Sequence, residues 1–443
     1  MYYFILLIIL IILTIVAIYC NKGDFLEPDA LLLAMFSFAT SVGLYLYNYW
    51  DLGNYGSQTV LIILLGLISF SIGSYIARHF RISIGSNRSD TFHSEIPLFS
   101  RINVSPTVHS FVTLISVLIL VIFIQYFRRV ASSSSIASMI SLYKDIRTSD
   151  DANMPSYLNV LIKVSAGFAH IALFILLNNI VSKNRHISDL FFLVPVLSYS
   201  MICLLSANRG DILMLAIGGF VTGYILYCRK YGWSRKQSAT VIRKGAKYGI
   251  ILLVLFWAFL LYIGRDIHAG DRNIFKYLCS YISGSLASFD LYLKQGGVPT
   301  TKWGQETFVA LNNNLYSIFK IGEPSQRYLE FRSTIAYSTT NIYSSFRRFH
   351  HDFGYGGVIW LSLLQGMITS AMYKKVKYNH KRATDVDFSL CFYGFFAYTI
   401  VYTLIDELFY SSNVSISGFV KVVILFVCYK VYFYQSNQEK MIP

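Results

Sequence analysis

The chain has 443 residues, a formal net charge of +15 and a mean hydropathy of +0.50. Hydrophobic residues make up 55% of it and charged residues only 14%, whereas soluble domains carry roughly a quarter charged residues. This composition excludes an ordinary soluble protein, because too few polar groups are present to cover its surface in water. We attribute the positive charge to Lys and Arg in cytoplasmic loops rather than to nucleic-acid binding, and we expect no nucleic-acid partner.

Apolar stretches near the roughly 20 residues that a membrane-spanning helix requires recur along the whole chain. The first lacks the basic start and the small-residue cleavage motif of a signal peptide, so we interpret it as a retained helix. The sequence therefore predicts an all-α polytopic membrane protein, with a single integral membrane domain over 1–443. About eleven spans are expected, at 2–20, 30–50, 58–77, 107–127, 156–181, 190–205, 212–228, 248–264, 355–373, 386–405 and 419–435.

The connections between these spans differ in charge according to the face on which they fall. Connections 51–57 and 406–418 hold no Lys or Arg and lie on the face opposite the basic ones. The positive-inside rule makes the basic face cytoplasmic and the N-terminus external. We expect a bacterial inner-membrane protein whose basic connections lie within 78–101, 183–185, 229–247 and 374–382.

Two long segments then fall on the outer face, at 128–155 and 265–354. The second has the size of a small domain, contains many aromatic residues, and is expected to form a large periplasmic loop. The six cysteines show no metal-ligand spacing, and the loop holds only Cys279, so neither a zinc site nor a disulfide is expected.

Polar groups gather at three places on the predicted outer face. The turn 206–211 holds Arg209, and the next helix starts near Asp211, where its dipole favours a carboxylate. The segment 264–272 contains Arg265, Asp266 and Arg272. The simpler explanations are an arginine that reaches lipid headgroups in the first place and internal Arg–Asp pairs in the second.

The third group, at 338–357, is the densest. It holds Arg347, Arg348, His350, His351 and Asp352, followed by glycines that allow a sharp entry into the next span. Arginine forks match phosphate oxygens, and a neighbouring Asp or His can take a proton from a hydroxyl. An ordinary loop-to-span junction is the alternative interpretation.

The stretch TTNIYSSFRRFHHDFGYGG, with the large loop before it and the Arg-Gly turn further upstream, resembles the Wzy-type O-antigen polymerases, or oligosaccharide repeat-unit polymerases. The family pattern reads Asn-x-Tyr, then Arg, then Asp-Phe-Gly. The adjacent histidines are less typical of that pattern. The matching positions are Asn341, Tyr343, Arg347, Asp352, Phe353 and Gly354.

The resemblance implies a GT-C-like glycosyltransferase without a metal or other cofactor. Its donor and acceptor would both be undecaprenyl-pyrophosphate-linked glycans, used at the periplasmic face to build O-antigen or a similar surface polysaccharide. Membrane lipid, a chain-length regulator and a flippase are the other partners it implies.

The resemblance also implies roles for the polar residues on the outer face. Arginines would neutralise the pyrophosphate, an Asp or His would act as the base, and further residues would contact sugar or shape the site. In that order the sets are Arg209, Arg265, Arg272, Arg347 and Arg348; then Asp352, His350, His351 and Asp266; then Asn341, Tyr343 and Gly354.

Three alternatives stay open on the sequence alone. An O-antigen ligase, which transfers the chain to lipid A–core, shares the many spans and the large outer loop. A transporter or flippase of lipid-linked sugars would favour charged or Gly/Pro-broken positions at mid-membrane depth, of which the spans hold few. A non-enzymatic scaffold for envelope assembly is the third.

Overall fold

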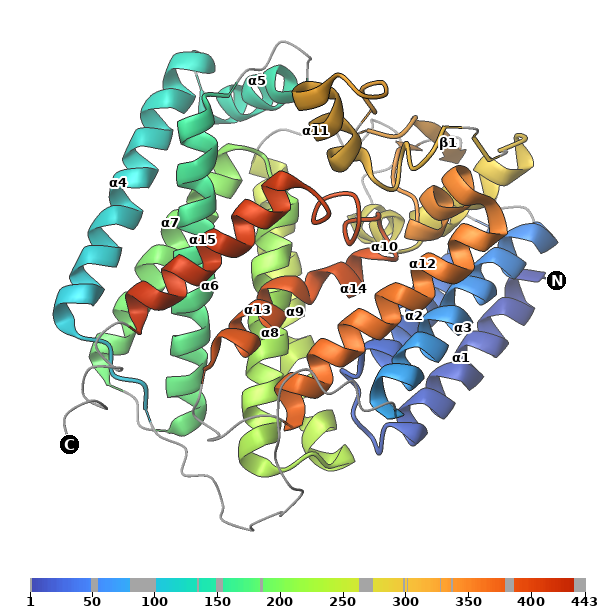
Figure 1. The fold of residues 1–443 in the computed structure, drawn as a ribbon, viewed down its shortest axis with the longest axis horizontal. Helices are drawn as coiled ribbons and strands as arrows, with labels where there is room; N and C mark the ends of the chain where they lie inside the picture. The colour runs from blue at the N-terminus through green and yellow to red at the C-terminus, as the bar shows by residue number, and fades with distance from the viewer. Residues whose placement is uncertain are drawn as a thin grey trace. The chain divides into compact units, whose positions relative to one another are not determined.

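The structure is a computed structural model that describes residues 2–48, 55–79, 101–133, 135–148, 154–183, 186–262, 274–297, 299–300, 302–326, 328–335, 338–378 and 386–433. These residues form helices, connecting turns and one short antiparallel ribbon (Figure 1). The chain divides into two compact units, each made of segments distant in sequence. Unit 1 comprises 1–93, 266–375 and 399–419, and unit 2 comprises 94–265, 376–398 and 420–443.

Unit 1 contains the N-terminal helices, the large loop and the helix that follows it. In Figure 1 the blue helices α1 to α3 lie side by side with the orange α12. The loop supplies α10 and α11 and the ribbon of β1 and β2, in which Arg332 pairs with Thr340. The bounds are α1 Tyr2–Cys20, α2 Pro28–Tyr45, α3 Ser57–His79, α10 Ile274–Lys294, α11 Val309–Phe319, β1 Arg332–Ile335, β2 Ser338–Thr340, α12 Ser345–Tyr378 and α14 Tyr398–Tyr402.

Glycines allow α3 and α12 to pack closely. A Cβ added at Gly73 would lie 2.0 Å from the carbonyl oxygen of Leu363, and one added at Gly366 would lie 2.1 Å from that of Phe70. Small residues at such crossings let helix backbones approach each other, which is how helices commonly associate in membranes. This contact fixes α12 against the N-terminal helices and thereby positions the residues at its start.

A second glycine divides α12 itself. Gly354 has φ 60° and ψ −152°, a backbone conformation that is essentially restricted to glycine. The first turns of α12, which carry the Arg, His and Asp residues, are therefore set off by a kink from the long apolar part that follows. One of the glycines predicted to allow a sharp turn, Gly354, therefore lies at a kink, while entry into the membrane at this point stays a prediction.

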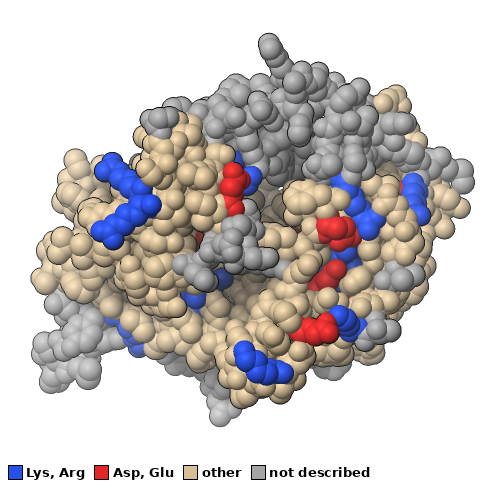
Figure 2. All heavy atoms as spheres, turned by 90° about the horizontal axis from the view of Figure 1, so that it is seen from above, with Lys and Arg blue, Asp and Glu red and all other residues tan. Residues whose placement is uncertain are grey.

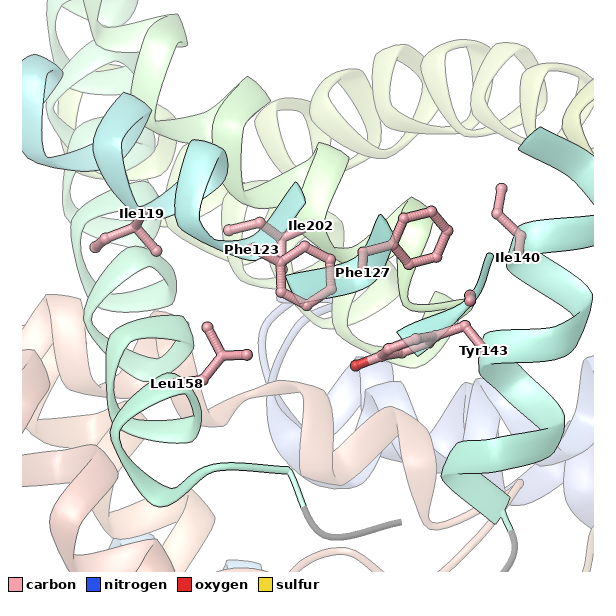
Figure 3. Packing of buried hydrophobic residues seen from close by; sticks show 8 residues of the cluster. Ile119, Phe123, Phe127, Ile140, Tyr143, Leu158 and Ile202 are labelled. Atoms are coloured by element: carbon pink, nitrogen blue, oxygen red, sulfur yellow. The ribbon is translucent and has the colours of Figure 1, made fainter. Parts of the chain in front are cut away.

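Unit 2 is built around α6, which packs against α4, α7, α8 and α13. Phe123 and Phe127 of α4 meet Tyr143 of α5, with the Phe127 and Tyr143 ring centroids 5.4 Å apart (Figure 3). Leu158 and Ile202 complete this apolar cluster from α6 and α7. The bounds are α4 Pro106–Val130, α5 Ile136–Thr148, α6 Ser156–Ser182, η1 Ile187–Phe192, α7 Leu193–Leu205, α8 Arg209–Tyr231, α9 Arg235–Tyr262, α13 Phe388–Phe396 and α15 Ile416–Tyr432.

Helical stretches long and apolar enough to cross a membrane number seven among the described residues. They are α1, α2, α3, α4, α6, the η1–α7 pair and α8. The predicted polytopic, membrane-embedded helical architecture is thereby confirmed. The remaining expected spans coincide with helical segments in α9, α12, α13–α14 and α15, but they are not among the seven, so a count of eleven stays a prediction. The single membrane domain and the GT-C-like class likewise stay predictions.

Candidate functional site

The candidate site is built on the first turns of α12, in unit 1. The helix start is held by Ser345, whose backbone N–H donates to the carbonyl of Thr403 at 2.9 Å and whose hydroxyl donates to that of Asp406 at 3.1 Å. Because this end is anchored and Gly354 follows only nine residues later, the side chains between them are held on a short, fixed piece of helix.

Arg347 is the most deeply buried charged residue of this piece, with 1% of its surface exposed. Its guanidinium donates to the carboxylate of Glu306 and, from Nη2, to both oxygens of Glu330 at 2.9 Å. It also lies 4.5 Å from the ring centroid of Tyr292 and 5.0 Å from that of Tyr343. Two carboxylates and two aromatic faces therefore surround one guanidinium, and cation–π contact adds to the ion pairs.

Arg348 points to a different set of oxygens. Its Nε donates to Oδ1 of Asp406 at 2.9 Å and its Nη1 to the backbone carbonyl of Glu306 at 3.1 Å. Glu407 lies next along the chain and is fully buried, and its carboxylate accepts from the N–H groups of Tyr410 and Ser411, each at 2.7 Å. Burial raises the pKa of Glu407 to about 7, although these two bonds and Arg348 act in the opposite direction.

The two histidines have different surroundings. The Nδ1 of His351 shares a hydrogen bond with the Tyr292 hydroxyl at 2.8 Å, and its Nε2 lies 3.5 Å from Oε1 of Glu306. Its side chain is 22% exposed. His350 is only 2% exposed, its Nδ1 has no hydrogen-bond partner, and burial followed by the nearby His351 lowers its pKa. Of the two, His351 is therefore the ring that a ligand can reach.

Asp352 holds the loop in place. Its carboxylate accepts hydrogen bonds from the backbone N–H of Glu306 at 3.0 Å and of Thr307 at 2.6 Å. Glu306 is thus contacted by four neighbouring residues of α12. Hydrogen bonds join it to Arg347, Arg348 and Asp352, and His351 lies 3.5 Å from its carboxylate. Glu306 is the residue on which the whole segment converges.

Glu330 has the same partner as Glu306 but lies nearer to solvent. Its side chain is 41% exposed, whereas that of Glu306 is 13% exposed. Partial burial raises the pKa of Glu330, but Arg347 and Arg332 act against burial. The net result is a pKa below the usual value of a glutamate. Burial, with the opposing charge of Arg347, sets the pKa of Tyr292 at about 12, so this hydroxyl keeps its proton near neutral pH.

Six of the predicted site residues lie on α12, the five charged or imidazole side chains before the kink and Gly354 at the kink itself, and Tyr343 joins them by stacking on Arg347. Asn341 is partly buried just before the helix. Arg209 is the first residue of α8, in unit 2, next to a hydrogen bond of 2.6 Å between Asn208 and Asp211. The remaining predicted residues, Arg265, Asp266 and Arg272, lie outside the described residues. Catalysis by any of these residues stays a prediction.

Sequence reasoning missed the acidic half of the site. Glu306, Glu330 and their neighbour Arg332 belong to no motif, and Tyr292 was one of many loop aromatics. The charges could have indicated these residues, because a buried pair of arginines requires carboxylates as partners and the loop contains few of them. Seen from the side on which α11 and β1 lie in Figure 1, acidic and basic side chains adjoin in several places (Figure 2).

The chemistry available here is anion binding and proton transfer. Within the described part of the chain, no three His, Cys, Asp or Glu side chains group closely enough to hold a metal ion. Comparison with protein-family models, with curated proteins and with solved structures finds no match.

Proposed function

We propose that the chain polymerises oligosaccharide repeat units carried on undecaprenyl pyrophosphate, as a GT-C-like glycosyltransferase of a bacterial inner membrane. In this proposal eleven helices span the membrane and the site faces the periplasm, on the side of the connections that hold no Lys or Arg. The product is O-antigen or a similar surface polysaccharide.

The observation that carries the proposal is the cluster of guanidinium, carboxylate and imidazole groups immediately before the Gly354 kink. A lipid-linked pyrophosphate sugar presents its reacting carbon close to the membrane surface, because its prenyl chain stays in the bilayer. The cluster adjoins the apolar length of α12, so its cations and its proton acceptors lie at the end of a predicted span. An ordinary junction of loop and helix does not require four neighbouring side chains to converge on one glutamate.

The reaction needs two things from the protein, cations and a base. The acceptor hydroxyl attacks the anomeric carbon of the donor, the bond from that carbon to the pyrophosphate oxygen breaks, and the pyrophosphate leaves with the electron pair. Cations stabilise the departing charge, and a base takes the hydroxyl proton. In our proposal Arg347 serves the pyrophosphate, and His351 is the base, oriented by Tyr292 and Glu306 until the acceptor binds.

His351 is preferred to the other candidates on geometry. The carboxylate of Asp352 is engaged by two backbone N–H groups, and His350 is buried among protein atoms. His351 has an accessible ring, with the Glu306 carboxylate 3.5 Å from Nε2 and the Tyr292 hydroxyl bonded to Nδ1. In our proposal the acceptor hydroxyl replaces that of Tyr292 at Nδ1 and gives its proton to this nitrogen. The sequence predicted Asp352 as a candidate base; in our proposal it instead holds the backbone of Glu306 and Thr307.

The proposed orientation is tested by cysteine labelling in intact cells. Ser317 in the loop and Ser234 between α8 and α9 are both exposed. In a Cys20→Ser background, which removes the exposed native thiol, a membrane-impermeant maleimide should label Ser317→Cys and not Ser234→Cys. Labelling of Ser234→Cys alone would reverse the orientation and remove the periplasmic site.

The function is tested by the polysaccharide that cells display. His351→Gln should lose long chains, since removal of a general base lowers the rate by about 10²–10⁴-fold. Cells should then carry single repeat units on their lipopolysaccharide core, while the exposed His79→Gln should leave the ladder normal. A core without any repeat unit would show a ligase instead, and units retained on the cytoplasmic leaflet would show a flippase.

A further inference from the structure

The carboxylate of Glu330 lies between two guanidinium groups. Its Oε1 accepts from Arg332, at 3.2 Å from Nε and 3.0 Å from Nη2, and also from Nη2 of Arg347 at 2.9 Å. Both guanidinium carbons lie near the Tyr292 ring, at 4.5 Å for Arg347 and 5.3 Å for Arg332. One acidic side chain therefore occupies the point on which two planar forks converge, which is the geometry that arginine uses for phosphate.

The members of this group differ in how firmly they are held. Arg347 has a side chain that is 2% exposed, while Arg332 and Glu330 are 20% and 41% exposed. Glu330 belongs to a stretch, 320–331, whose described residues form no helix or strand. Tyr343 donates to the backbone carbonyl of Glu330 at 2.9 Å, so the main chain is anchored while the carboxylate extends towards solvent. The side chain can thus rotate away without moving the buried arginine.

The charges balance only while Glu330 is in place. Glu306 pairs with Arg347, and Glu330 pairs with both Arg347 and Arg332. If the Glu330 carboxylate swings out, two guanidinium groups face one remaining carboxylate. A diphosphate diester, with about two negative charges, then more than replaces the single charge that has left.

We propose that Glu330 is a resident counter-ion at a diphosphate subsite formed by Arg332 and Arg347, and that the diphosphate of the substrate displaces it on binding. The proposal rests on the proposed function for the identity of the substrate and adds Arg332 and Glu330 to its binding site. Glu330 leaves the site only when an anion takes its place. Between turnovers it therefore stays bound and neutralises the arginines.

The test is binding of inorganic pyrophosphate to the purified full-length protein in nanodiscs of neutral lipid. Glu330→Gln removes the competing charge and should tighten binding roughly fivefold. Arg332→Gln should weaken it by a similar factor, because it removes one fork. Glu323→Gln is the matched control, since it deletes a loop carboxylate that pairs with Lys302 and not with Arg347 or Arg332. It should leave the affinity unchanged.

The proposal is overturned if Glu330→Gln binds pyrophosphate no more tightly than Glu323→Gln, or if Arg332→Gln binds as well as the unmodified chain. Farnesyl diphosphate in the same nanodiscs separates the sources of the ligand: competition with pyrophosphate shows that a lipid-linked diphosphate takes the subsite, and binding elsewhere contradicts that. Binding is measured without turnover, so the two proposals can fail separately. If the protein polymerises but Glu330→Gln does not bind pyrophosphate more tightly, only the counter-ion role of Glu330 is rejected. Tighter binding without any polymerase activity would reject only the proposed reaction.

Discussion

Replacement of Glu306 by Gln is the sharpest test of the site's internal structure, because this residue is the common contact of four neighbours. Gln keeps the backbone bonds to Arg348 and Asp352 and removes only the charge facing Arg347 and His351. Breaking one side of a buried ion pair costs about 3–5 kcal/mol. Since Arg347 retains Glu330, we expect Glu306→Gln to lower the free energy of unfolding by about 2–3 kcal/mol.

The companion variant Glu330→Gln has the same guanidinium as partner but a side chain that is 41% exposed. Solvent screens such a pair, so its loss should cost less than about 1 kcal/mol. The assay is denaturation of the purified protein in mixed micelles, followed by helix content, with Glu323→Gln as the control for loss of a loop charge. An equal or larger loss in Glu330→Gln than in Glu306→Gln would refute the assignment of Glu306 as the buried counter-ion.

Two further predictions concern stability elsewhere in unit 1. Gly73→Ala and Gly366→Ala should each lower the free energy of unfolding by about 1–3 kcal/mol, because the added methyl group meets a backbone oxygen. The control is Gly356→Ala, also in α12, where the methyl group meets open space and should not destabilise the protein. An equal loss of stability in the control would contradict the α3–α12 contact. Glu407 has a pKa of about 7 when folded, against 4.5 for an unperturbed glutamate, so between these two pH values the folded form holds a proton that the unfolded form has lost. The contribution of Glu407 to stability should therefore be complete below pH 4.5 and fall by at most roughly 3 kcal/mol as pH rises through 7, and Glu407→Gln should remove this part of the pH dependence. A pH dependence unchanged in that variant would exclude Glu407 as a source.

The helices of this fold could be read from the sequence because lipid imposes a simple rule. A membrane span must form its backbone hydrogen bonds internally and must be long and apolar. The stretches 2–20, 58–77 and 107–127 could therefore be recognised as helices from the sequence. The kink at Gly354 could also be predicted, since only glycine adopts that backbone conformation. The exact lengths of the helices could not be predicted. The second span was expected to end at residue 50, whereas α2 ends at Tyr45.

The candidate site could be predicted only by half. Arg347, Arg348, His351 and Asp352 are neighbours in sequence, so a dense polar segment revealed them. Glu306 and Glu330 are distant from them and stand alone, and the contact that unites these residues depends on how the loop folds back. The stretch 320–331, which carries Glu330, forms no helix or strand in its described residues, so no periodic pattern predicts its path.

The central claim is tested most directly by polymerisation with purified components. The protein in nanodiscs, supplied with an undecaprenyl-pyrophosphate-linked repeat unit, should extend it to longer lipid-linked chains and release undecaprenyl pyrophosphate. Arg347→Lys should retain a fraction of this activity, because it keeps the charge but loses the two-pronged fork, and His351→Gln should lose it. Each variant should be recovered in the same amount as the unmodified chain. Full extension by His351→Gln would remove that residue as the base, and no extension by the unmodified protein, with its repeat unit recovered intact, would contradict the proposed function.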